Sequence, residues 1–228
     1  MSKTIVVIGF GPGVSNSVAE KFGAEGFSVA LVARNAERLA AGVAALKARG
    51  VAAAAFPADA GDPLALRATI RAAQAELGPI SALHWNAYGG EPIDLATTDP
   101  AKIARVFDIP IIGLLSAVQE ALEDLKAAGD GAVLITNGAF GDITPMMDRF
   151  ATSLNAVGLA LGNAAKDKLA GLLAERLKGE GVHVAEVIIG GGVKGTATAG
   201  DQGIDPADIA EAFWRLYQGR SEIRARVP

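Results

Sequence analysis

The sequence of 228 residues predicts an α/β fold in three layers, with helices on both faces of a doubly wound, mostly parallel sheet of about seven strands. Short β-branched or apolar segments alternate with longer Ala- and Leu-rich segments of helical period. The short segments are apolar at most positions, as expected for strands that are buried on both faces. No linker, repeat or low-complexity tract divides the chain, so we expect one domain over residues 1–228.

The predicted elements alternate strand and helix along most of the chain. The six main strands are predicted at 4–9, 28–33, 51–56, 80–85, 132–137 and 183–189. The helices between them are predicted at 14–23, 36–50, 63–77, 101–128 and 155–179. A last helix at 205–218 and a short edge strand at 223–227 complete the series. Helix ends near the strand starts are indicated by Gly26, Gly50, Gly78 and Gly181.

The composition excludes several classes of protein. The net charge is −4 with both signs interspersed, which argues against a nucleic-acid binder. The chain has no cysteine and only two histidines, far apart in sequence, so we expect neither disulfides nor a metal site. No apolar run reaches the roughly 18 residues of a membrane span, and the N-terminus lacks a signal-peptide pattern. We therefore expect a cytoplasmic protein without a membrane partner.

A glycine-rich turn follows the first predicted strand and precedes a helix. The pattern G-x-G-x-x-G fails because its third position is Val14, whereas G-x-x-x-G-x-G fits with Gly9, Gly13 and Ser15 in the final place. Such a turn lets the backbone approach a pyrophosphate and present N–H groups at a helix N-terminus, and the Ser15 hydroxyl can also donate to a phosphate. We interpret the turn as the nucleotide site of a Rossmann domain; a purely structural tight turn is the alternative.

This spacing resembles the short-chain dehydrogenase/reductase (SDR) family, and the resemblance extends over nearly the whole chain. It implies an NADP(H)-binding Rossmann fold. Arg34-Asn35 follows the second strand, where NADP-preferring members carry a basic residue for the 2′-phosphate, although a solvated loop arginine is the alternative. Asp59-Ala60 and Asn86-Ala87 match family positions after the third and fourth strands. By the same similarity, Val193 and Thr196 face the nicotinamide carboxamide.

The resemblance also locates four catalytic positions, and none holds the family residue. Members use a Tyr as proton donor, a Lys four residues later, a Ser and an Asn; the corresponding residues here are Leu159, Asn163, Gly138 and Pro110. The two tyrosines, Tyr88 and Tyr217, are not followed by Lys at the fourth residue, so no other alignment restores the pair. The catalytic residues are therefore unknown. From Gly138 to Leu159 the chain runs 21 residues, longer than in the family, which indicates a rebuilt loop.

A few other residues are candidates for this site. Lys166 lies on nearly the same helical face as Leu159, two turns away, and we interpret it as a solvated helix lysine with a functional role as the alternative. Tyr88, Gly138 and Leu159 are candidates for the substrate pocket. Met146 and Met147 are expected to pack as a flexible lid. His84, in a buried-looking strand, is expected to be a core residue.

Two classes of function remain open. The first is an atypical NADP(H)-dependent oxidoreductase, acting on an unknown small-molecule substrate, in which another acid or water supplies the proton. The second is a catalytically silent NADP(H) binder, such as a redox sensor or a partner in an assembly. The family resemblance also implies a homodimer or homotetramer formed through the two long helices at 101–128 and 155–179.

Overall fold

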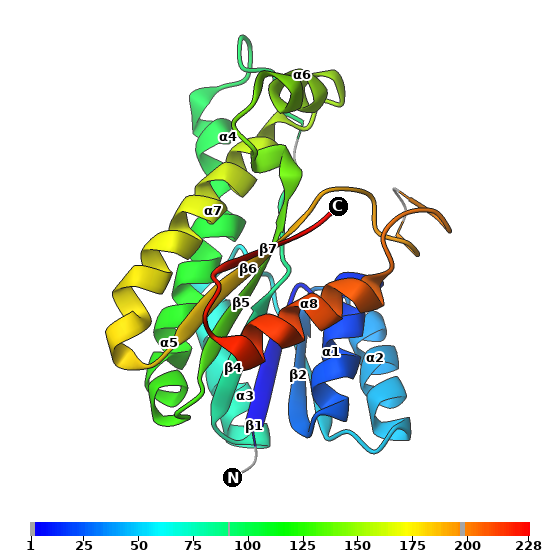
Figure 1. Ribbon diagram of the computed structural model, residues 1–228, viewed down its shortest axis with the longest axis vertical. Helices are drawn as coiled ribbons and strands as arrows, with labels where there is room; N and C mark the ends of the chain where they lie inside the picture. The colour runs from blue at the N-terminus through cyan, green and yellow to red at the C-terminus, as the bar shows by residue number, and fades with distance from the viewer. Residues whose placement is uncertain (1–2, 91, 197–198) are drawn as a thin grey trace.

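The computed structural model describes residues 3–90, 92–196 and 199–228. Its centre is one seven-stranded sheet with the order β3-β2-β1-β4-β5-β6-β7, in which every pair of neighbours is parallel (Figure 1). The strands are β1 (Lys3–Ile8), β2 (Phe27–Ala33), β3 (Ala53–Pro57), β4 (Ile80–Trp85), β5 (Ala132–Gly138), β6 (His183–Ile189) and β7 (Arg224–Val227). The order reverses between β1 and β4, and the carboxyl ends at such a switch point form the usual ligand crevice of the fold.

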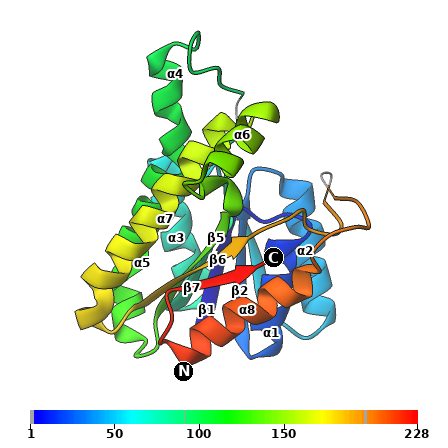
Figure 2. The same ribbon diagram turned by 45° about the horizontal axis from the view of Figure 1, so that its top comes forward.

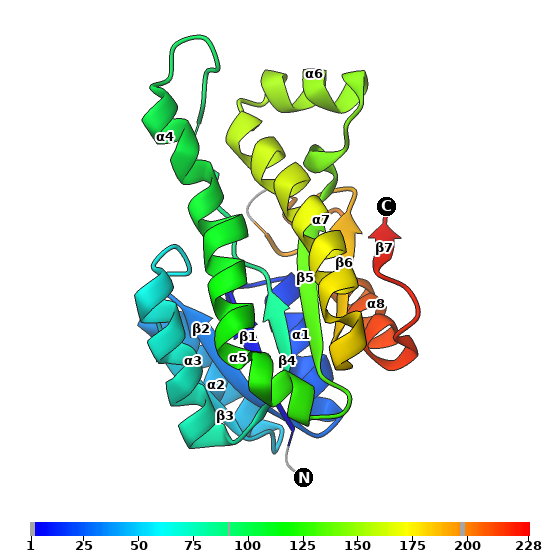
Figure 3. The ribbon, with the colours of Figure 1, turned by 90° about the vertical axis from the view of Figure 1, so that its left-hand side faces the viewer.

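Helices cover both faces of the sheet, which confirms the three-layer prediction. One face carries α1 (Val14–Ala24), α2 (Ala36–Ala48) and α8 (Pro206–Gly219), and the other carries α3 (Pro63–Leu77), α5 (Leu114–Ala127) and α7 (Val157–Leu177) (Figures 1 and 3). Alternate residues of β1 enter the two cores: Ile5 and Val7 pack toward α1 and α8, whereas Val6 and Ile8 pack toward α3 and α5. This division explains why the strands are apolar at successive positions.

Four glycines end helices as the sequence predicts. Gly26, Gly50, Gly78 and Gly181 have φ angles of 92°, 78°, 92° and 76°. A side chain is strained in this left-handed region, so glycine there lets the chain leave each helix toward the next strand.

The predicted helix at 101–128 is wrong as a single helix. The structure divides it into α4 (Pro100–Ala104), a 3₁₀ turn η1 (Arg105–Phe107), a π-helical turn η2 (Asp108–Gly113) and α5. Pro110, inside η2, has no N–H and its ring obstructs the preceding turn, so the regular α-helical bonds cannot continue through it.

The rebuilt loop contains a helix that the sequence analysis did not predict. The short 3₁₀ turn η3 (Ala139–Gly141) follows β5, and then α6 (Pro145–Ser153) precedes α7. Thr144 caps α6 by accepting a bond from Met147 N at 3.2 Å, and Pro145 occupies its first position. In Figure 2 α6 lies above the carboxyl ends of the strands. No helix within the described ranges has the length and apolar character that a membrane span requires.

Candidate active site

The glycine turn is built around a close approach between two chain segments. Gly9 has a φ of 86°, and a Cβ atom there would collide with the backbone of Ala87. Asn86 holds the approach in place, because its Nδ2 donates to the Gly9 carbonyl at 3.1 Å and its N–H donates to Ile8 O at 2.8 Å. Gly9, Asn86 and Ala87, predicted separately from the sequence, thus form one structural unit.

The turn leads into the N-terminus of α1, and no side chain in the described part of the protein caps this helix. Gly13 is the residue before the helix, with a φ of 90°, so the N–H groups of Val14 and Ser15 stand in the first turn without intrahelical partners. The Ser15 side chain is fully buried; its hydroxyl donates to Gly11 O at 3.1 Å and accepts from Gly11 N at 2.9 Å. That hydroxyl therefore holds the turn together through both of its bonds to Gly11.

The loop after β6 lies against this turn. A Cβ at Gly13 would be 3.1 Å from Thr196 Cγ2 and 3.5 Å from Val193 Cγ1. The Thr196 hydroxyl donates to Val193 O at 2.6 Å, which holds the two residues in a tight turn. Residues 180 positions apart in sequence are thus neighbours at the same edge of the sheet.

Basic side chains border the glycine turn on the β2 side. Arg34 is exposed at the end of β2 and forms no hydrogen bond or ion pair with the described residues. Asn35 caps α2 by accepting from Arg38 N at 2.8 Å. Arg38 itself was missed by the sequence analysis: its Nη1 lies 3.8 Å from the position that a Cβ would take at Gly11. Arg38 follows Arg34 by four residues, and this spacing is the feature of the sequence that could have indicated a second basic residue at this site.

Asp59 and Ala60 follow β3 at the same edge. The Asp59 carboxylate accepts from Gly61 N at 2.9 Å, and the Ala60 carbonyl lies so close to Gly113 of η2 that a Cβ there would collide with it. The close approach of η2 fixes the path of this loop.

Three of the four predicted catalytic positions meet at the N-terminal half of α7. Asn163 Nδ2 donates to Gly138 O at 3.3 Å, and a Cβ at Gly138 would lie 2.9 Å from the same nitrogen. Pro110 packs against the neighbouring Gly162, 3.2 Å from the position of a Cβ there. Leu159 lies one turn earlier on α7 and is half-buried, and Tyr88 is 68% exposed. None of the residues at these four positions has a side chain that ionises.

A buried polar cluster is hydrogen-bonded to Asn163 and Gly138. Asn137 Nδ2 donates to Asn163 O at 3.1 Å and to Glu186 Oε2 at 3.0 Å, while its Oδ1 accepts from Gly138 N at 3.0 Å. Glu186 is fully buried on β6, and its Oε1 lies 2.9 Å from Arg224 Nε. Burial, together with a hydrogen bond that protonated Glu186 donates to the Asp167 carboxylate, raises the pKa of Glu186 to about 7.

The interpretation of Lys166 as a solvated lysine is wrong. Lys166 lies on the face of α7 that packs on the sheet, and only 3% of it is exposed. Burial lowers its pKa to about 8, against a smaller opposing effect of the Glu186 charge. The burial cannot be predicted from the sequence because α7 lacks a clear apolar stripe.

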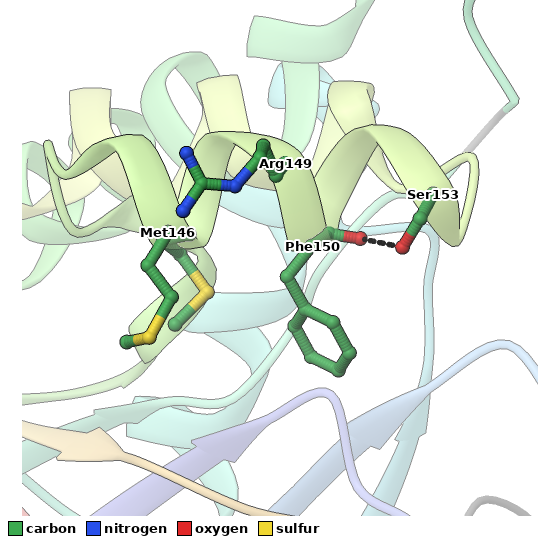
Figure 4. A pocket seen from close by; sticks show the side chains of 5 residues that line it. Met146, Arg149, Phe150 and Ser153 are labelled. Atoms are coloured by element: carbon green, nitrogen blue, oxygen red, sulfur yellow. Dashed lines mark hydrogen bonds between the residues drawn. The ribbon is translucent and has the colours of Figure 1, made fainter.

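The new helix α6 carries an apolar surface over the site. A cavity of about 570 Å³ is lined by Met146, Met147, Arg149, Phe150 and Ser153. Figure 4 shows the Met146 and Phe150 side chains projecting from the same side of α6. Phe150 stacks on Phe140 of η3 with ring centroids 5.5 Å apart, which anchors α6 to the segment after β5.

Two further polar residues, His84 and Asp142, have structural roles. His84 is fully buried, its Nε2 lies 3.0 Å from Thr136 Oγ1, and burial lowers its pKa to about 3, so the prediction of a core histidine is confirmed. Asp142, which precedes α6, forms a two-point ion pair with Arg226 of β7, at 2.7 and 2.9 Å. Over residues 3–90, 92–196 and 199–228 no cluster of three metal-ligating side chains occurs.

Known proteins with this architecture are numerous. A short-chain dehydrogenase from Rhodopseudomonas palustris is 25% identical, with a TM-score of 0.81 over 99% of this chain and 98% of that one. L-Sorbose reductase from Gluconobacter frateurii, complexed with NADPH and L-sorbose, is 17% identical, with a TM-score of 0.85 over 99% and 95% of the two chains. An NADPH-bound short chain oxidoreductase from Pseudomonas aeruginosa PAO1 that contains an atypical catalytic center is 21% identical, with a TM-score of 0.83 over 99% and 95%.

The family described as short chain dehydrogenase matches residues 3–203, which include the glycine turn, the positions at the ends of β2 to β6 and the helix α7. The chain therefore belongs to the short-chain dehydrogenase family of oxidoreductases.

Proposed function

We propose that the protein is an NADP(H)-dependent oxidoreductase whose active site does not use the Tyr and Lys of its family. The observation that carries the cofactor assignment is the uncapped N-terminus of α1 beside two basic side chains, Arg34 and Arg38. A helix N-terminus with free N–H groups suits a pyrophosphate, and guanidinium groups suit a further phosphate.

The residues present fit a dinucleotide along its whole length. The turn at Gly9 and Gly13 admits the pyrophosphate because a side chain at either glycine would fill or strain the approach. The residues that would hold the cofactor are Gly9, Gly13, Val14, Ser15, Arg34, Asn35, Arg38, Asp59, Ala60, Asn86, Ala87, Val193 and Thr196. When bound, the cofactor supplies or accepts a hydride, and the protein supplies orientation and electrostatic support.

The preference for NADP(H) over NAD(H) rests on charge. No Asp or Glu closes β2, so the acid that would hold a free ribose diol is missing, whereas Arg34 and Arg38 stand at that end of the strand. Both side chains are exposed and have no carboxylate partner among the described residues, so their guanidinium groups are available to an anion. A 2′-phosphate is such an anion.

A non-standard site is supported by the residues at the four family positions. Leu159, Asn163, Gly138 and Pro110 offer no proton near neutral pH, and three of them already pack together. The Pseudomonas aeruginosa protein has the same fold, binds NADPH and contains an atypical catalytic center. It supports the view that this fold can bind the cofactor beside a non-standard catalytic site. Tyr88, Gly138 and Leu159, with α6 above them, would border the substrate.

The same four residues also support the alternative, a catalytically silent NADP(H) binder. General acid catalysis typically contributes about 10²- to 10⁴-fold, so its complete loss would leave little activity. NADPH oxidation across a panel of ketones, enones and imines distinguishes the two: substrate-dependent oxidation supports the enzyme, and tight NADPH binding without oxidation of any compound supports the silent binder.

The proposal is tested first by titrating NADPH and NADH against the protein while following nicotinamide fluorescence. Charge-assisted hydrogen bonds contribute about 1.5–3 kcal/mol, so R34A and R38A should each weaken NADPH binding by about 10- to 100-fold and leave NADH binding nearly unchanged. R215A, which removes an exposed arginine of α8, is the matched control. Equal affinity of the wild type for both nucleotides would remove the assigned role of the arginines, and binding of neither would remove the cofactor.

A further inference from the structure

Lys166 is a charged side chain in an unusual place. Only 3% of Lys166 is exposed. It forms no hydrogen bond or ion pair within the described residues. Burying an ammonium group without a partner is costly, and such lysines are rare outside functional sites. Its neighbour Asp167 and the nearby Arg224 are paired with each other and leave Lys166 outside their ion pair.

The position of Lys166 relates it to the candidate active site. It follows Asn163 by three residues on α7, so the two lie on the same helical face about 4.5 Å apart along the axis. Long side chains on a helix lean toward its N-terminus, and a lysine has a four-carbon stem. Glu186, whose charge acts on Lys166, is linked through Asn137 to Asn163 O and Gly138 N, so Lys166 lies beside the cluster at which the family would place two of its catalytic residues.

We propose that Lys166 supplies the proton to the substrate during reduction, in place of an acid at positions 138, 159 and 163. This inference rests on the proposed function, because it needs a reduced nicotinamide to deliver the hydride. The substrate carbon gains the hydride and forms a C–H bond, while the electron pair of the broken π bond takes a proton from the Lys166 ammonium group. Lys166 is left as a neutral amine, which solvent reprotonates after the product leaves.

The electrostatic setting suits that role. Burial has already lowered the pKa of Lys166 to about 8, so its proton is released more readily than that of an ordinary lysine, yet the group is still charged near neutral pH. Among the charged groups on the elements that pack against α7, the one that acts on Lys166 is the Glu186 carboxylate. The other charged or titratable groups on η1, η2, α6, η4 and β6, which pack against α7, are Arg105, Asp108, Asp148, Arg149, Lys178, Glu180 and His183. On α7 itself the neighbours are Asp167, which is paired with Arg224, and the exposed Lys168.

A measurement that needs no substrate tests the position of Lys166. Its pKa is followed by ¹³C NMR of the lysine Cε atoms in the free protein, in the NADPH complex and in the NADP⁺ complex, with the signal assigned by its loss in K166M. The positive nicotinamide ring of NADP⁺ should lower the pKa by about one pH unit relative to NADPH, because the two like charges share a low-dielectric site. An identical pKa in the two complexes places Lys166 too far from the ring and overturns the proposal.

Activity variants test the role itself, using phenanthrenequinone, cyclohexenone and a cyclic imine as probe substrates. K166M should lower kcat by about 10²- to 10⁴-fold, and K166R, which keeps the charge but does not release a proton near neutral pH, should be equally slow. K168M, two residues further on and exposed, should match the wild type. NADPH binding should change by less than about twofold in all three.

The outcomes separate this inference from the proposed function. A merely structural role predicts that K166R restores activity and that the dependence of kcat on pH keeps its shape in both variants; that result overturns the proposal. Binding of neither nucleotide to the wild type contradicts the proposed function. Nucleotide binding with full activity in K166M leaves the proposed function standing and removes only Lys166.

Discussion

At the scale of single residues, two titratable side chains are buried beside the candidate active site, at a cost in stability. Lys166 and Glu186 are both buried between α7 and the sheet, and burial moves the pKa of each toward neutrality, to about 8 and about 7. Glu186 is paired with Arg224, whereas Lys166 has no ion-pair partner among the described residues. A buried charge without a partner is destabilising, and sites where one persists often trade stability for function. Asn137 links Glu186 to Asn163 O and Gly138 N by hydrogen bonds.

The free energy of unfolding should be lowered by the buried charge of Lys166. The pKa of Lys166 is lower in the folded protein than its ordinary 10.5, so the folded state carries a penalty that is complete below about pH 8 and disappears as the pH rises toward 10.5. K166M, which keeps an apolar stem of similar length, should therefore raise the free energy of unfolding by about 3 kcal/mol at pH 7 and by much less at pH 10. Urea unfolding at the two pH values measures both quantities. An equal gain in K168M would show that the effect is not specific to the buried position.

At the scale of elements, the active-site side of the sheet is shaped by interruptions of regular structure. The π-helical turn η2, with Pro110 inside it, brings Gly113 against the Ala60 carbonyl and places Pro110 on Gly162 of α7. The 3₁₀ turn η3 places Gly141 against the backbone of Asn163 and Ala164. Close backbone approaches of this kind require glycine, so each glycine sets the distance between two elements.

The approach of η2 to the loop after β3 can be tested at Gly113. In G113A the new methyl group would collide with the Ala60 carbonyl oxygen, and relief of the overlap should cost about 1–3 kcal/mol of stability. Thermal unfolding measures the loss. G90A is the control, because a Cβ at Gly90 meets no atom within 4 Å. Similar melting temperatures for the two variants would contradict the tight approach.

The helix α6 should determine the size and polarity of the substrate. Met146 is 66% exposed and Phe150 50% exposed on the wall of the cavity, so the apolar part of a substrate can cover them. For 2-alkanones of increasing length binding to the NADPH complex, affinity should rise about fourfold for each buried CH₂ group. In M146S and F150S this dependence on length should flatten, whereas L64S, at an exposed position of α3, should keep it. A dependence unchanged by all three variants would place the substrate elsewhere.

At the scale of the whole molecule, the parallel sheet gathers the site at one edge. The predicted cofactor residues follow five different strands, β1 to β4 and β6, and all lie at their carboxyl ends because neighbouring strands run in the same direction. The C-terminal strand β7 extends the arrangement: Arg224 is paired with Glu186 and Asp167, and Arg226 with Asp142. Charges from the last strand thus hold both α7 and the segment after β5.

The outer faces of the long helices should form an interface between copies of the chain. Leu172 on α7 is 57% exposed, and Ile112 near the end of η2, just before α5, is 45% exposed. We expect a dimer or tetramer in sedimentation analysis, and L172K should dissociate it because a charge would enter an apolar contact. L64K, on α3, should leave the assembly intact. A monomeric wild type would contradict the predicted association.

The sequence by itself determined the layers of the fold, the glycine turn and the residues at the strand ends. These features depend on local patterns: the period of apolar residues, glycine at positions of positive φ, and the order in which parallel strands meet one edge. The resemblance to the family assigned Gly138 and Asn163 to catalytic positions, and the structure shows that Asn163 Nδ2 donates to Gly138 O at 3.3 Å.

Only the tertiary structure decided which polar residues are buried and which segments touch. The buried face of α7 includes Gly162, Asn163, Lys166 and Ala170, a set without an apolar pattern, so the burial of Lys166 follows from the packing of that helix on β5 and β6. The position of Arg38 beside Gly11 and the course of α6 depend on contacts between separate elements. Sequence periodicity reports the environment of a residue only when its neighbours on the same face share that environment, and at this site they do not.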